Sequence, residues 1–175
     1  MSELTPSALI ELLGLVPLPH EGGHFRQTWV SDVAIAPDAL GPRYRGAKPA
    51  GTAIYYLLTD DPDSFSALHR LPTDEVYHFY LGDPVQQVLL HPDGRTERVL
   101  LGPALAAGQR VQHVVPRGVW QGSRLLAGGR VALLGTTMAP GFDSSDYEPG
   151  VREALLRAYP AEAEAIVALT RQPHA

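Results

Sequence analysis

Short runs of strand-forming residues, each ended by turn residues, fill the middle of the chain from Thr52 to Thr137. The runs are TAIYYLLT, SFSALHRL, EVYHFYL, VQQVLLH, RVQHVVP, VWQGSRLL and RVALLGTT, and pairs such as Asp93-Gly94 and Gly128-Gly129 form turns between strands. Many short strands at this spacing are typical of a β-sandwich or β-barrel, whereas a doubly wound sheet needs a helix between successive strands. The pattern therefore predicts an all-β fold.

Length and composition indicate a single domain, residues 1–175, with one sizeable core, since 45% of the 175 residues are hydrophobic. The formal net charge is -5, with a single lysine and no basic stripe, which argues against a nucleic-acid partner. The chain has no cysteine, so disulfides and thiolate chemistry are excluded. No apolar run approaches the roughly 18 residues of a membrane span, and no cationic leader is seen. We expect no membrane partner and a cytoplasmic location.

Helices are predicted on both sides of the strand region. Thr5 is placed to cap a short N-terminal helix, Pro6 suits its first position, and Gly14 is placed to end it. The barrel core is expected over about 24–138. Beyond it, VREALLRAYP and AEAEAIVALT indicate a helical segment over about 148–171, divided by a proline. We expect these helices to pack on the barrel or at a subunit interface.

The stretch SALHRLPTDEVYHFYLGD holds the polar residues that most suggest a site. Alternation puts four side chains on one face: Glu75, Tyr77, Phe79 and Leu81. A carboxylate in line with aromatic side chains is typical of a small-molecule pocket. His69 precedes Glu75 by a turn, so the two side chains can converge. An imidazole beside a carboxylate is half of a metal site or an acid/base pair. The alternative is a hydrogen-bonded histidine and a solvated glutamate.

A second stretch, VVPRGVWQGSRLL, enters a strand through a tight turn and brings Gln121 to one face. Arg26, in an earlier strand, is suited to hold an anionic group, and Tyr55 or Tyr56 must face inward. The candidate ligand-binding residues are Arg26, Thr28, Tyr55, Ser66, Phe79, Trp120 and Gln121. Core packing or a solvated surface position is the alternative role for several of them.

These motifs resemble those of the cupins, and most closely the cupin-5 branch, also called DUF985. LHRLPTDEVYHFYLG is similar to the first cupin motif and PRGVWQG to the second, while PHEGGHFRQTW, AIYYLL and MAPGFDSSDYE extend the resemblance along nearly the whole chain. The resemblance implies a double-stranded β-helix, the jelly-roll barrel of cupins, and commonly a homodimer. It also implies a structural similarity to sugar-nucleotide epimerases and seed storage proteins.

The same resemblance implies a metal-ligand set that this chain keeps in part. Metal-binding cupins typically offer two histidines and a glutamate from the first motif and a histidine from the second. Here His69 and Glu75 are present, but Gln121 stands at the second-motif histidine position. Glutamine is a weak ligand for first-row transition metals compared with imidazole. We therefore expect no required cofactor, and a divalent metal held by His69, Glu75 and Gln121 is the alternative.

The preferred function is binding of a small polar, carbohydrate-like metabolite in the barrel, followed by its isomerisation or epimerisation. His69 would be the base, Glu75 would tune or orient it, Tyr77 or Tyr55 would be the acid, and Arg26 would hold an anionic group. Two other classes stay open: a metal-dependent cupin such as a dioxygenase or isomerase, and a non-catalytic small-molecule binding module. The preference for an epimerase depends on similarity of fold, which is a weak guide to function.

Overall fold

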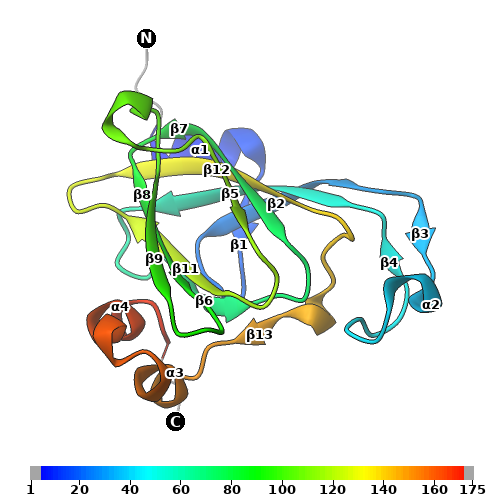
Figure 1. Ribbon diagram of the computed structural model, residues 1–175. Coiled ribbons are helices and arrows are strands. Elements are labelled where there is room, and N and C mark those ends of the chain that lie inside the picture. The colour runs from blue at the N-terminus through cyan, green and yellow to red at the C-terminus, as the bar shows by residue number, and fades with distance from the viewer. Residues whose placement is uncertain (1–4, 172–175) are drawn as a thin grey trace.

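The computed structural model describes residues 5–171, so the first four and last four residues of the predicted 1–175 domain lie outside the described part. Two antiparallel sheets form the walls of a barrel (Figure 1). The first has six strands in the order β1-β2-β5-β12-β7-β10, and the second has five in the order β13-β6-β11-β8-β9. This jelly roll confirms the all-β, double-stranded β-helix fold expected from the sequence.

The strands of the six-stranded sheet are Val16–Pro17 (β1), His24–Val30 (β2), Thr52–Thr59 (β5), Glu75–Gly82 (β7), Gln112–Val115 (β10) and Val131–Met138 (β12). Those of the five-stranded sheet are Ser66–Arg70 (β6), Val85–Leu90 (β8), Thr96–Leu101 (β9), Trp120–Leu125 (β11) and Glu148–Pro149 (β13). An arm extends from one side of the barrel (Figure 1) and contains Ala34–Ile35 (β3), Pro37–Leu40 (α2) and Lys48–Pro49 (β4). Short 3-10 helices lie at Leu105–Ala107, Ser144–Asp146 and Pro160–Glu162.

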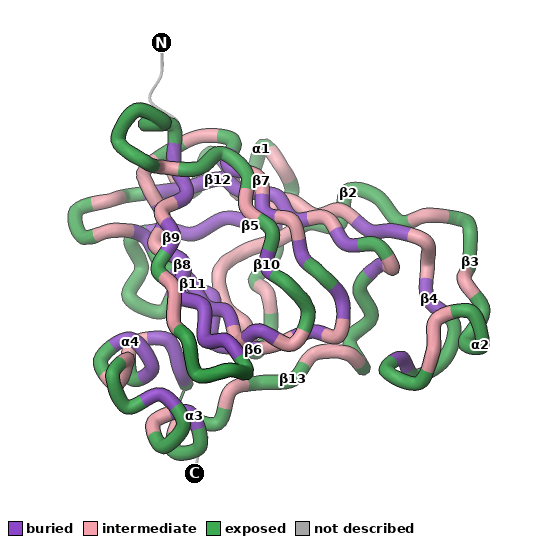
Figure 2. The backbone as a smooth tube through the Cα atoms, in the orientation of Figure 1, coloured by how far each residue is buried: buried purple, intermediate pink, exposed green. Residues whose placement is uncertain are grey.

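The apolar core lies between the two sheets, because alternate side chains of each strand point inward. Figure 2 shows the buried residues concentrated in the barrel strands, while much of the arm and many connections are exposed. Leu58 and Leu134 meet Leu89 and Leu101 in this core, and all four are fully or almost fully buried. Burial of such a side chain contributes about 1.5–3 kcal/mol, so the core is the main source of stability.

The N-terminal helix, Pro6–Leu13 (α1), begins and ends as its sequence predicts. The Thr5 hydroxyl accepts a hydrogen bond from the first turn, and Gly14 closes the helix in the left-handed conformation. Its buried Leu9 packs with Leu57 on the outer face of the six-stranded sheet. The helix therefore covers one end of that face.

The C-terminal helices, Arg152–Ala158 (α3) and Ala163–Ala168 (α4), lie against the outer face of the five-stranded sheet (Figure 1). Leu155 and Ile166 pack there with Leu90 of β8. The expected packing of these helices on the barrel is thereby confirmed. None of the helices within residues 5–171 is long and apolar enough to cross a membrane.

Within the described residues, the six-stranded sheet has two β-bulges, which change which side chains face inward. The extra residue is Thr28 in β2 and Tyr80 in β7, because the register to the neighbouring strand shifts at each. Strict alternation fails beyond each bulge. Leu81, predicted to share a face with Phe79, packs instead with the outer cluster around Leu9, which corrects that prediction.

Candidate functional site

A cavity of about 70 Å³ opens between the sheets, where β5 and β7 begin and β12 ends. Apolar side chains such as Leu18, Ile54 and Met138 form part of its wall. The ionisable residues of the wall are Glu21, Tyr56, His69, Glu75, Tyr77 and Tyr147. Convergent polar groups in an apolar cavity are the usual arrangement of a small-molecule site.

His69 lies in β6 and is 2% exposed. Its Nδ1 lies 2.7 Å from the carbonyl oxygen of Ala67. Because a carbonyl oxygen accepts and never donates, Nδ1 carries the proton in this contact, and the neutral imidazole has its lone pair on Nε2. The Tyr147 ring stacks on the imidazole, with 5.1 Å between ring centres and 23° between the ring planes. These two contacts hold His69 in the wall as a hydrogen-bond acceptor.

Glu75 is the first residue of β7 and is 7% exposed. Its Oε2 accepts a hydrogen bond of 2.7 Å from Nε2 of Gln121. The hydroxyls of Thr136 and Tyr77 lie near the carboxyl group in the same wall. Burial raises the pKa of the Glu75 carboxyl, and the nearby His69 and the polar contacts oppose this in part. Glu75 therefore holds a proton more readily than a glutamate in water.

Gln121 comes from β11, where it pairs with His69 in the strand register. It is 2% exposed, and its Oε1 has no hydrogen-bond partner in the described part of the chain. A buried acceptor without a partner costs roughly 1–3 kcal/mol, which a buried water molecule would recover. Gln121 does not itself line the cavity, so it contributes to the site through its hydrogen bond to Glu75.

The tyrosines of the wall are hydrogen-bond donors. Burial raises the pKa of the Tyr56, Tyr77 and Tyr147 hydroxyls above the usual tyrosine value, and the negative charge of Glu21 adds to the shift in each case. The Tyr56 hydroxyl donates to the carbonyl oxygen of Gly22 at 3.0 Å. These phenols stay protonated at neutral pH and can donate to oxygen atoms of a ligand.

Glu21 is a cavity residue that sequence reasoning missed. It lies in the loop between β1 and β2, where its Oε1 accepts a hydrogen bond of 2.8 Å from the Ser66 hydroxyl. The Ala67 N–H donates to the Glu21 carbonyl oxygen at 2.8 Å. Gly22 has a φ of +103°, and a Cβ there would lie 2.4 Å from the Phe65 carbonyl oxygen, so the turn requires glycine. The glycine pair in PHEGGH was the available signal that this loop turns sharply.

Arg26, Thr28 and Tyr55 lie away from the cavity, contrary to their predicted orientation. The Arg26 guanidinium lies 5.6 Å from the centre of the Tyr55 ring, and the Thr28 hydroxyl donates to a backbone carbonyl of β5. The adjacent residues Gln27 and Tyr56 line the cavity instead. The physical reason is alternation, because neighbouring residues of one strand face opposite sides of the sheet.

The other predicted ligand-binding residues divide between the site and the core. Ser66 does not line the cavity, but its hydroxyl donates a hydrogen bond to the cavity residue Glu21. Phe79 lies deeper in the apolar core. Trp120 packs toward the C-terminal helices, and the Arg70 guanidinium lies 4.6 Å from the centre of its ring. Phe79 and Trp120 are therefore structural rather than cavity-lining residues.

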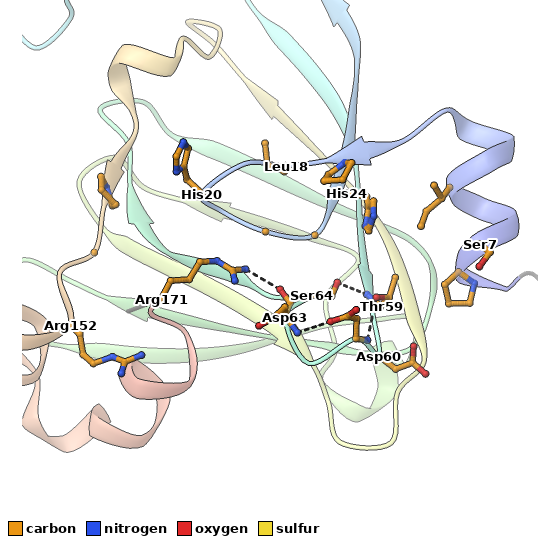
Figure 3. Close-up of a pocket in the computed structure, with 18 of the residues that line it drawn as sticks. Ser7, Leu18, His20, His24, Thr59, Asp60, Asp63, Ser64, Arg152 and Arg171 are labelled. Carbon is orange, nitrogen blue, oxygen red and sulfur yellow. Dashed lines mark hydrogen bonds between the residues drawn. The ribbon is translucent and has the colours of Figure 1, made fainter. Parts of the chain in front are cut away.

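A larger groove, of about 940 Å³, lies on the other side of the β1–β2 loop (Figure 3). Leu18 borders both the groove and the barrel cavity. Figure 3 shows His20 and His24 near the loop, and Asp63 and Arg171 across from it, where Arg171 donates to the Asp63 carbonyl oxygen at 2.9 Å. The predicted site residues do not line this groove, so the chemical argument concerns the smaller cavity.

A family model described as "Cupin superfamily (DUF985)" matches residues 7–149, which include the strands and most of the cavity wall. The chain belongs to this cupin family. The resemblance inferred from the sequence motifs is thereby confirmed.

This cupin is 30% identical over 152 residues to the uncharacterised protein YML079W of Saccharomyces cerevisiae, covering 81% of the chain and 75% of that protein. Among solved structures it is similar to protein SO0799 from Shewanella oneidensis, with 32% identity, a TM-score of 0.83 and coverage of 95% and 98%. A hypothetical protein from Leishmania major has 30% identity, a TM-score of 0.84 and coverage of 96% and 99%. These names state no activity, so the function must be argued from the cavity.

The donor set of this cupin does not fit the metal that the resemblance implies. Within residues 5–171, no group of three or more His, Cys, Asp or Glu side chains is placed to hold a metal ion. The Gln121 amide nitrogen is turned to the Glu75 carboxylate that a metal would bind. What remains is Nε2 of His69 and a shared carboxylate, fewer strong ligands than a transition-metal site needs. No chemical step is therefore derived through a metal.

Proposed function

We propose that this cupin binds a small hydroxylated, carbohydrate-like metabolite in the barrel cavity and transfers a proton at the carbon beside its carbonyl group, as an isomerase or epimerase does. The main support is the His69 imidazole, whose Nδ1–H is bound to Ala67 and whose Nε2 is left as an acceptor. The buried carboxyl group of Glu75 lies in the same wall. A base and a carboxyl group of shifted pKa in one cavity suit proton transfer at carbon.

In the proposed step, Nε2 of His69 takes the proton from carbon. The electron pair of the broken C–H bond forms a carbon–carbon double bond, and the carbonyl π pair moves onto oxygen. The Tyr77 hydroxyl, which lies in the same wall as Glu75, donates a hydrogen bond to that oxygen. For isomerisation, the proton of the adjacent hydroxyl group moves to the former carbonyl oxygen, and the electron pair of that O–H bond forms the new carbonyl π bond. The pair of the carbon–carbon double bond takes the proton back from His69 at the neighbouring carbon, so no oxidant, reductant or co-reactant is consumed.

Cavity size limits the ligand. One buried water needs about 10–15 Å³ of such volume, so a cavity of about 70 Å³ holds roughly five water-sized groups. A hydroxycarbonyl fragment of three or four carbons fits this space, whereas a whole nucleotide does not. The fragment can be the complete substrate or one end of a longer one.

The test follows hydrogen–deuterium exchange by proton NMR in D₂O, with short hydroxyaldehydes, hydroxyketones and their phosphates. The wild type should exchange the carbon-bound proton of at least one compound, and His69→Gln should slow this exchange by about 100- to 10,000-fold. Arg26→Gln, altered on the outer face, should match the wild type. Binding without exchange would contradict the proton transfer and favour a non-catalytic binding module.

We also propose a homodimer that forms through the outer face of the six-stranded sheet. Tyr80 is 49% exposed there, stacks on His78, and meets the Tyr55 ring edge to face. Val76 and the 46%-exposed Val114 pair beside them. Exposed apolar patches of this kind often mark protein interfaces. Light scattering should give a dimer mass, which Tyr80→Lys should reduce; a monomeric wild type would contradict this proposal.

A further inference from the structure

A second depression adjoins the barrel cavity. It has a volume of about 450 Å³, and Leu71 and Tyr147 line both spaces. Arginine side chains form much of its wall: Arg43, Arg45 and Arg70. The two spaces therefore lie next to each other, and a ligand that reaches past Leu71 and Tyr147 would enter this arginine groove.

The segment that carries Arg43 and Arg45 is held by two buried side chains, one between these arginines and one after them. Between them, Tyr44 is buried, and its hydroxyl lies 2.8 Å from the Thr73 hydroxyl oxygen. After them, Lys48 is fully buried, and its Nζ lies 2.8 Å from Oδ2 of Asp146 and 3.5 Å from Oδ1 of Asp143. The backbone at the groove is therefore held in place, while the flanking arginines are exposed.

The charges of the groove do not cancel. Glu148 accepts two hydrogen bonds from Arg70, at 2.7 and 2.8 Å, and Asp146 pairs with Lys48. The Arg43 guanidinium lies 5.1 Å from the centre of the Tyr44 ring, an interaction that leaves its N–H groups available. Across residues 5–171, no hydrogen bond or ion pair engages Arg43 or Arg45. The guanidinium groups of Arg43 and Arg45 thus line the groove, and neither forms an ion pair with a described acidic side chain.

We propose that Arg43 and Arg45 bind the anionic group of the ligand, a phosphate or a carboxylate, while its hydroxycarbonyl end occupies the barrel cavity. The guanidinium fork matches both anions, because it donates parallel hydrogen bonds to two oxygens. This assignment rests on the proposed function for the choice of ligand. It also gives the role first expected of Arg26, which lies on the outer face, to two residues that line the groove beside the cavity.

The first test uses inorganic phosphate and acetate, so that it does not depend on the carbon skeleton. Phosphate binding is followed by ³¹P NMR and acetate binding by proton NMR. Arg43→Ala/Arg45→Ala should weaken binding of the preferred anion about 10- to 100-fold, as expected for charge-assisted hydrogen bonds. Arg124→Ala/Arg157→Ala removes equal charge from exposed sites outside the groove and should leave binding unchanged. No binding by the wild type, or equal loss in both double variants, would overturn the proposal.

The second test connects the groove to the cavity. Dihydroxyacetone phosphate and hydroxypyruvate should bind the wild type at least about tenfold more tightly than neutral dihydroxyacetone, and Arg43→Ala/Arg45→Ala should remove the difference. Glu75→Gln should weaken dihydroxyacetone and leave inorganic phosphate unaffected. A wild type that binds dihydroxyacetone but not phosphate would contradict the arginine groove, whereas a wild type that binds phosphate but not dihydroxyacetone would contradict the proposed function. Equal affinity of charged and neutral compounds would overturn the further inference.

Discussion

Gln121 and Glu75 join the two sheets of the barrel through one buried hydrogen bond. Nε2 of Gln121, on β11, donates to Oε2 of Glu75, on β7, at 2.7 Å. At the position where the cupin resemblance implies a metal-binding histidine, this chain therefore has Gln121. Its side-chain amide hydrogen-bonds the Glu75 carboxyl group. This hydrogen bond engages the carboxyl group that would otherwise be a metal ligand.

Replacement of this amide by imidazole should create metal affinity. We expect Gln121→His to bind Zn²⁺ at least about tenfold more tightly than the wild type, because it would add a strong ligand beside His69 and Glu75. Calorimetric titration measures the difference. Gln121→His/Glu75→Gln should lose the gain, and equal affinity of Gln121→His and the wild type would show that these side chains do not converge.

Glu75 should make the protein less stable as pH rises. Folding raises the pKa of Glu75 above its usual value of 4.5, so between these two values the folded chain binds more protons than the unfolded chain. The associated stability is present below the usual value and is lost as pH rises through the raised one. Glu75→Gln should therefore gain in Tm relative to the wild type as pH increases from about 4.5. Calorimetry at several pH values, with exposed Glu153→Gln as control, tests this; a constant difference would contradict it.

Lys48→Met should destabilise the fold by about 3–5 kcal/mol, because it leaves a buried carboxylate without its partner. The side chain of Asp146 is 3% exposed and lies 2.8 Å from Lys48. Urea unfolding measures the free energy. Lys48→Met/Asp146→Asn should recover part of the loss, since no buried unpaired charge remains; the Asp143 side chain is 47% exposed. A single-variant cost below about 1 kcal/mol, the scale of a surface ion pair, would show that the pair is solvated.

Gly22→Ala should cost about 1–3 kcal/mol in the free energy of unfolding, because the residue has positive φ and a Cβ would meet the Phe65 carbonyl oxygen. Gly128→Ala is the matched control, since Gly128 has a φ of +85° and open space around it. It shares the backbone strain without the contact. Equal costs in urea unfolding would mean that the contact with Phe65 adds nothing.

Much of the fold could be predicted from the sequence because its signals are local. Turn residues between short runs indicate the strands, and Thr5 and Gly14 mark the ends of α1. The bulges at Thr28 and Tyr80 have no such local signal. The prediction from strict alternation that Leu81 shares a face with Phe79 was therefore wrong. The homodimer and the cytoplasmic location stay predictions.

The candidate site was predictable to a smaller extent. His69 and Glu75 belong to the first of the two motifs and Gln121 to the second, so the sequence already indicated all three. In the structure Gln121 pairs with His69 in the strand register and hydrogen-bonds Glu75. Glu21 and Tyr147 come from irregular segments before and after the main strands, and tertiary folding alone brings them to the cavity. The choice between Tyr55 and Tyr56 depended on strand orientation, which an almost wholly apolar run does not reveal.

The most direct test of the account is the tautomer of His69, observed by ¹H–¹⁵N NMR of the neutral imidazole, with His69→Gln to assign the signals. The account predicts a proton on Nδ1, bound to the Ala67 carbonyl oxygen, and a lone pair on Nε2. Addition of a bound hydroxycarbonyl compound should shift the Nε2 signal. A proton on Nε2 would leave His69 without a free basic nitrogen in the cavity and would contradict its role as the base.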